Sequence, residues 1–517
     1  MSPAPATDPQ LPAETAAPSP FATEHLKADL KGRSLRGGAA TFLGQGIKFT
    51  VQLGSTAVLA RLLTPEHFGL IGMVTALTGF ASLFKDLGLS AATVQRADIS
   101  HQQISTLFWV NVTIGVLVAA VTAALGPVVA WFYGDPRLVP VTAALAVSFV
   151  FAGGTVQHQA LLRRQMRFRA LVCIDILAVS GGVATAVVGA ALGATYWSLV
   201  MMNVAMAFYT AVGVWVACRW RPGPPVRRAG IRSMLCFGAN LSSFGVMNYF
   251  ARNLDHILIG RYWGTGPLAF YAKAYGLLML PLHQINAPIA SVAVPALSRL
   301  QDQPERYRRF YLRAINTIAF VTMPLVATMA ILSKEMIGFV LGNQWVGASP
   351  IFMVLALAAF FQPIASTTGW VYVSLNRTRR MAIWGLISSP LTCVSFIIGL
   401  PWGPMGVAVS YTVFGYAMCY FMLVFCFKSS PISVRDVLST LLRPTVLNLI
   451  MAGTMIAARF YVGNAHPLML VVVCLVAEGA AAALAVVLWK ALRADLKSTL
   501  DMAVAMFHVR SPELSGR

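Results

Sequence analysis

The chain has 517 residues, of which 57% are hydrophobic and only 11% are charged. This composition excludes a soluble globular protein of such length and indicates a polytopic membrane protein. The formal net charge of +21 could suit a nucleic-acid-binding protein. However, most Lys and Arg residues fall in short segments between apolar runs, which is a membrane-topology signal, so we expect no nucleic-acid partner.

Fourteen apolar runs have the length that a helix needs to cross a hydrocarbon core of about 30 Å. The predicted spans are about 36–60, 67–87, 104–132, 139–162, 171–192, 195–218, 233–260, 267–294, 312–332, 349–373, 381–400, 403–427, 438–461 and 467–491. An even number of spans places both termini on the same side of the membrane.

The basic residues orient these spans. Of the 39 Lys and Arg residues, 31 fall on the side that holds both termini, five fall on the other side, and three lie within spans. Because Lys and Arg accumulate on the cytoplasmic side, this bias predicts a multi-pass protein with both termini in the cytoplasm.

Three weak internal similarities recur in the same order at offsets of 200 to 213 residues. They predict two six-helix lobes of related topology, as in many transporters. The expected organisation is a disordered cytoplasmic tail over 1–33, an N-terminal lobe over 34–220 with helices 1–6, and a C-terminal lobe over 221–430 with helices 7–12. Residues 431–517 then hold helices 13 and 14 and a cytoplasmic tail.

The first predicted span carries a lysine near its middle. Lys48 lies three residues after Gln45 and four before Gln52, so the three side chains form one polar stripe on the helix. A lysine at mid-membrane costs several kcal/mol unless it faces protein or water. We therefore expect Lys48 to line a central hydrophilic cavity.

The seventh span has a second polar stripe. Asn248, Arg252 and Asp255 follow one another at helical spacing, Tyr249 lies beside them, and Lys273 follows in the eighth span. The pattern predicts a cationic cavity for an anionic head group, with Asp255 as a candidate cation-coupling residue. Two alternatives stay open: Arg252 and Asp255 form a structural ion pair, and Lys273 extends toward the membrane surface.

Enzyme motifs are missing from the sequence. There is no Walker-type phosphate loop, no H-E-x-x-H and no G-x-S-x-G, and the polar segments are too short for a catalytic domain. We expect neither an enzyme nor a cofactor or metal.

Five segments together resemble the polysaccharide transport family of the multidrug/oligosaccharidyl-lipid/polysaccharide exporter (MOP) superfamily, in particular its Wzx and WzxC-like flippases. They are residues 59–69 (LARLLTPEHFG), 85–96 (KDLGLSAATVQR), 160–169 (ALLRRQMRFR), 254–261 (LDHILIGR) and 295–300 (PALSRL).

The resemblance implies an all-α fold of about fourteen transmembrane helices and a bacterial inner-membrane location. It also implies export of polyprenyl-diphosphate-linked oligosaccharide repeat units by alternating access. The partners that it implies are membrane lipids, a polysaccharide polymerase and export machinery. On this interpretation Lys48 and Arg252 neutralise the diphosphate, while Gln45, Gln52, Asn248 and Tyr249 contact sugars. The alternatives are a cation-coupled multidrug antiporter, a lipid II flippase and a non-transporting scaffold.

Overall fold

The computed structural model describes residues 30–86, 88–96, 99–226, 249–250, 252–428, 430–463, 467–489 and 492–493. Over these residues the regular secondary structure is helical, and no strand is formed. The all-α prediction is therefore confirmed. Asn248 and most of the predicted N-terminal tail lie outside the described residues, and the first described helix already begins at Leu30.

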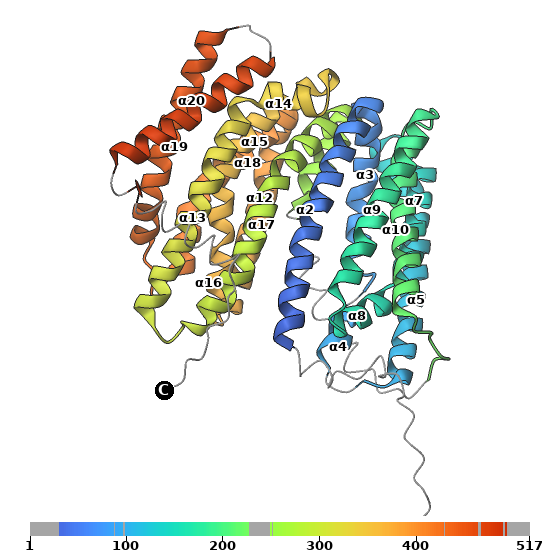
Figure 1. Cartoon of the computed structure of the whole chain (residues 1–517). Helices are drawn as coiled ribbons and strands as arrows, with labels where there is room; N and C mark the ends of the chain where they lie inside the picture. The colour runs from blue at the N-terminus through green and yellow to red at the C-terminus, as the bar shows by residue number, and fades with distance from the viewer. Residues whose placement is uncertain are drawn as a thin grey trace, which may run out of the picture.

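A first group of helices occupies one side of the molecule (Figure 1). It comprises α2 (Leu30–Leu62), α3 (Pro65–Ser82), α4 (Leu89–Gln95), α5 (His101–Ala124), α6 (Gly126–Tyr133), α7 (Leu138–Gly153), α8 (Val156–Arg164), α9 (Phe168–Ala191) and α10 (Trp197–Cys218). Within the group α9 packs between α2 and α10, and α5 packs along α7.

A second group begins with a helix over residues 252–263. It continues with α12 (Thr265–Arg299), α13 (Pro304–Ile331), α14 (Ser333–Val340), the short 3-10 helix η1 (Asn343–Ala348), α15 (Ser349–Ser366), α16 (Thr368–Ser374), α17 (Thr378–Gly399), η2 (Leu400–Trp402) and α18 (Gly403–Phe427). The last pair, α19 (Val434–Val462) and α20 (Pro467–Leu488), packs on the outside of this group through α13 (Figure 1).

All fourteen predicted spans overlap these helices, although most of the seventh falls on residues outside the description. By length and composition, nine of the described helical segments could cross a membrane, or ten if the bent pair α7 and α8 is one span. One of the nine, Thr378–Phe427, holds both α17 and α18. Because α2 and α3 contain several polar residues, they are not among the nine, and the number fourteen stays a prediction.

Local sequence signals start two of the long helices. Ser100 and Gln103 form a reciprocal capping box at the beginning of α5, and Ser433 and Asp436 form one at the beginning of α19. In each box the serine hydroxyl accepts a backbone N–H that the helix itself leaves unpaired. These ends are therefore determined by residues within one turn.

The largest apolar core joins the two helix groups. It contains Met73 and Leu199 from the first group and Leu268, Trp345 and Phe352 from the second, all buried. Here α3 and α12 approach so closely that a Cβ on Gly69 would lie 1.9 Å from the carbonyl oxygen of Thr265. The groups thus meet near the C-terminal end of α2, at the top of Figure 1.

Candidate functional site

A cavity of about 280 Å³ lies between the two helix groups. The first group contributes α3 and α10 to its wall, and the second contributes the 252–263 helix and α12. Its polar lining residues are Thr75, Asn203, Asn253, His256 and Lys273. The apolar part of the wall consists of Phe68, Ile71, Gly72, Ala76, Leu199, Met202 and Ala272. A concave apolar wall with a few polar groups is typical of a ligand site.

Lys273 supplies the positive charge of this lining. Its Nζ lies 4.1 Å from the centre of the Phe68 ring, so the ammonium group makes a cation–π contact across the boundary between the two groups. None of the described residues that line the cavity is acidic. The cavity is therefore suited to an anion rather than to an organic cation.

Asp255 lies directly behind the cavity wall and is only 5% exposed. Its Oδ1 accepts the backbone N–H of His256 at 2.8 Å and lies 3.0 Å from Nδ1 of the same residue. Its Oδ2 accepts the hydroxyl of Tyr271 at 2.9 Å. A buried carboxylate that accepts three hydrogen bonds has its hydrogen-bonding capacity largely filled and does not need a Lys or Arg partner.

Arg252 does not form the structural ion pair with Asp255 that the sequence left open. Among the described residues, the titratable side chain within 4.0 Å of the Asp255 carboxylate is the imidazole of His256, whereas Arg252 is exposed. The two oxygens of Asp255 are instead engaged by His256 and by the hydroxyl of Tyr271 on α12.

Tyr249 joins the second helix group to α3 beside the cavity. Its hydroxyl donates to the carbonyl oxygen of Ala76, a lining residue, at 2.5 Å. Its ring lies 5.8 Å from the ring of Phe80. A Cβ on Gly79 would come within 2.5 Å of the Tyr249 hydroxyl, so this contact depends on a glycine.

The polar stripe of α2 lies apart from the 280 Å³ cavity. Lys48 Nζ is 3.5 Å from Oδ2 of Asp175 on α9, and Gln45 and Gln52 are exposed. None of the three α2 residues lines the cavity. The structure therefore brings Lys273 and the surroundings of Asp255 together at one site and places Lys48 at another.

The family assignment follows from sequence comparison. A family described as polysaccharide biosynthesis protein matches residues 58–350, more than half of the chain. The chain belongs to this family. A relative is the lipopolysaccharide biosynthesis protein WzxC of Escherichia coli (strain K12), which is 24% identical over 426 residues, or 81% of this chain and 85% of the relative.

Solved structures show the fold of this family member. The lipid II flippase MurJ in an inward closed conformation matches with a TM-score of 0.70 at 15% identity, over 89% of this chain and 99% of MurJ. An inward-facing multidrug resistance MATE family transporter of the MOP superfamily matches with a TM-score of 0.54 at 14% identity, over 78% and 95%. The predicted all-α transporter-type fold is confirmed, and the two neighbours are named as a flippase and a transporter.

Four polar lining residues of this family member were not predicted as site residues from the sequence: Thr75, Asn203, Asn253 and His256. Thr75 and Asn203 are isolated polar residues in otherwise apolar helices, and each bonds a carbonyl oxygen of its own helix, at Ile71 and Leu199. An amide within an apolar span was the available signal. It could not be used without knowing that α3 and α10 face the second helix group.

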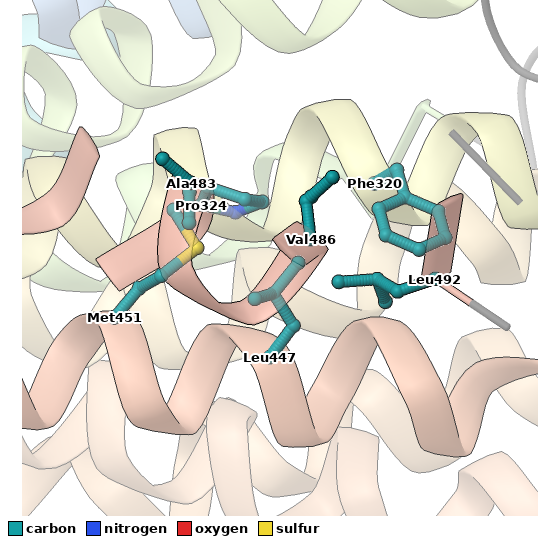
Figure 2. A pocket seen from close by; sticks show the side chains of 8 residues that line it. Phe320, Pro324, Leu447, Met451, Ala483, Val486 and Leu492 are labelled. Carbon is teal, nitrogen blue, oxygen red and sulfur yellow. The ribbon is translucent and has the colours of Figure 1, made fainter. Parts of the chain in front are cut away.

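A second cavity, of about 350 Å³, has a different character (Figure 2). It lies where α13, α19 and α20 meet, and Phe320, Leu447, Met451 and Val486 point into it. All of its lining residues are apolar: Phe320, Pro324, Leu447, Met451, Ala482, Ala483, Val486 and Leu492. This cavity offers no group that could hold a charge or a sugar hydroxyl.

Proposed function

We propose that this member of the polysaccharide biosynthesis protein family is a flippase for polyprenyl-diphosphate-linked oligosaccharide repeat units. The observation that carries the proposal is the cavity between the two helix groups, which has a cation, three uncharged polar residues and His256 in an otherwise apolar wall. A diphosphate cannot cross hydrocarbon without such a site, because a buried charge without a partner is prohibitively costly.

Each part of the substrate has a candidate partner. The diphosphate meets Lys273 in the cavity, and exposed Arg252 guides it from the same side. Lys48 offers a second cationic position on α2. Tyr249, together with Gln45, Gln52 and Asn248, contacts the sugar hydroxyls. The polyprenyl chain stays in the lipid, where its burial needs no polar partner.

We propose alternating access as the mechanism, and the packing of two helix groups around one cavity supports it. The groups separate first at one end and then at the other, and the substrate passes from the cytoplasmic to the periplasmic leaflet of the bacterial inner membrane. Both termini lie in the cytoplasm in this proposal, and a polysaccharide polymerase receives the product.

The charge of the lining supports this function over its rivals. A multidrug antiporter for organic cations needs free carboxylates, but none of the described lining residues is acidic, and Asp255 is engaged by His256 and Tyr271. A lipid II flippase handles the same lipid diphosphate chemistry, and the likeness to MurJ in fold keeps it as the second candidate.

The test uses cells that lack the protein and carry either the wild type or a variant. We expect Lys273→Met and Arg252→Ala to cause accumulation of lipid-linked repeat units and loss of surface polysaccharide, at unchanged protein levels in the membrane. Lys334→Met is the matched control, because Lys334 is an exposed lysine on α14 that does not line the cavity.

Three outcomes are distinct. Normal polysaccharide in both variants would contradict the assignment of the cavity. Accumulation of peptidoglycan precursor instead of repeat units would favour the lipid II flippase. Unchanged polysaccharide together with new sensitivity to organic cations would favour the antiporter.

A further inference from the structure

The imidazole of His256 is part of the cavity wall and is held in a defined tautomer. Its Nδ1 lies 3.0 Å from Asp255 Oδ1, and His256 itself lines the cavity. An ionised carboxylate can only accept hydrogen bonds, so Nδ1 carries the proton. Nε2 is then the unprotonated nitrogen, and no hydrogen bond to it is formed by the described residues.

Asp255 accepts two further hydrogen bonds besides the one from the imidazole. Asp255 accepts the Tyr271 hydroxyl and the backbone N–H of His256 in addition to Nδ1–H. Asp255 and His256 together therefore form a dyad with one negative charge when Nε2 is free and no net charge when Nε2 binds a proton.

We infer that the Asp255–His256 dyad is a proton-binding site whose occupancy sets the affinity of the cavity for an anionic diphosphate. With Nε2 free, the dyad offsets the charge of Lys273, and the region is nearly neutral. With Nε2 protonated, the region gains one positive charge. A diphosphate diester carries two negative charges, so it binds more tightly to the protonated form, and by linkage its binding promotes proton uptake.

Other titratable and charged groups surround the dyad, and their own titration has to be considered beside that of His256. Arg252 lies on the same helix, Lys273, Tyr271 and Tyr275 come from α12, Cys393 from α17 and Tyr411 from α18. The rings of Tyr271 and Tyr275 lie 5.5 Å and 6.4 Å from the His256 ring. Of the dyad and the groups around it, a histidine is the residue type that ordinarily exchanges its proton between about pH 5 and 8.

This inference rests on the proposed function, and its test separates the two. The purified full-length protein in lipid nanodiscs is titrated calorimetrically with geranyl-diphosphate-glucose. Both phosphates of this probe are esterified, so it has no weakly acidic proton of its own. Titrations in sodium-free buffers with different ionisation enthalpies report the number of protons taken up per molecule bound.

We expect the wild type to take up between zero and one proton and to bind on the order of tenfold less tightly as the pH rises through the titration of the dyad. His256→Gln keeps an amide beside Asp255 but cannot take up a proton. Its affinity should therefore be independent of pH and equal to the alkaline value of the wild type. His283→Gln, which replaces an exposed histidine of α12, should behave as the wild type.

Binding by the wild type without proton uptake and without pH dependence would overturn the inference and leave the proposed function standing. So would a His256→Gln protein that retains the uptake. The wild-type measurement alone shows whether binding takes up a proton. The test therefore holds even if the His256→Gln protein does not fold. No binding of the probe at any pH would overturn both proposals.

Discussion

The indole Nε1–H of Trp345 donates a 2.8 Å hydrogen bond to the carbonyl oxygen of Ala60, so a residue of the second helix group caps the end of the first long helix. Gln344 donates to the same oxygen, and Arg61 donates in return to the carbonyl oxygen of Phe339. Carbonyl groups in the last turn of a helix have no partner within the helix. The contact therefore holds the two helix groups together at this end. It also gives a carbonyl group in the last turn of α2 its hydrogen-bond partner.

The first prediction concerns this closure. Trp345→Phe keeps the aromatic packing against Phe68 but removes the donor, and one neutral hydrogen bond contributes about 0.5–1.5 kcal/mol. We expect the backbone amides of residues 343–348 to exchange with deuterium roughly fivefold faster. Trp131→Phe, a change at an 81% exposed residue, should leave the rate unchanged. Equal rates in both variants would show that the contact does not hold this end closed.

The second prediction separates a structural from a functional Lys48. The side chains of Lys48 and Asp175 are 36% and 56% exposed, so their ion pair contributes no more than about 1 kcal/mol. Asp175→Asn should therefore keep normal surface polysaccharide. Lys48→Met should lose it if the ammonium group meets the diphosphate, with little change in melting temperature. Normal polysaccharide with Lys48→Met would remove Lys48 from the proposed site.

The third prediction tests the close approach of α3 and α12. In Gly69→Ala the new methyl group would lie 1.9 Å from the Thr265 carbonyl oxygen, so backbone must shift, at a cost of about 1–3 kcal/mol. We expect a clear fall in the thermal midpoint of unfolding in detergent. Gly276→Ala on α12 meets no atom within 4 Å and should be neutral or slightly stabilising. Equal midpoints in the two variants would contradict the packing described.

The fourth prediction addresses a carboxyl group buried outside the cavity. Glu478 on α20 is 8% exposed, and its two oxygens lie 2.9 and 2.8 Å from the hydroxyl oxygen of Thr328 on α13. Thr328→Val removes the donor and should cost about 1–3 kcal/mol, because the buried carboxyl group then has no partner. Replacing both residues, as Thr328→Val with Glu478→Leu, should recover most of the stability.

The control for this pair is Thr392→Val. Thr392 donates only to the carbonyl oxygen of Ser388 on its own helix, so its loss should have little effect. The measurement is the thermal midpoint of unfolding of the wild type, Thr328→Val, the double variant and Thr392→Val. If Thr328→Val and Thr392→Val unfold together, the Thr328 contact does not stabilise the docking of α20.

The sequence by itself determined the class of the protein and the positions of its helices. Long apolar runs must form helices in a membrane, because every backbone polar group has to be paired within the segment. Capping residues such as Ser100 and Ser433 start their helices through contacts within one turn, which can be read directly from the residue order. Five short segments, between residues 59 and 300, also indicated the polysaccharide family that the match over residues 58–350 shows.

Only the tertiary structure decided which polar residues meet. Lys48 and Lys273 look alike in the sequence, since each is a lysine within a predicted span. One pairs with Asp175 on α9, and the other enters the cavity beside His256. Helical periodicity shows which face of its own helix a residue lies on. It does not show which helix that face contacts, because this depends on packing between segments up to hundreds of residues apart.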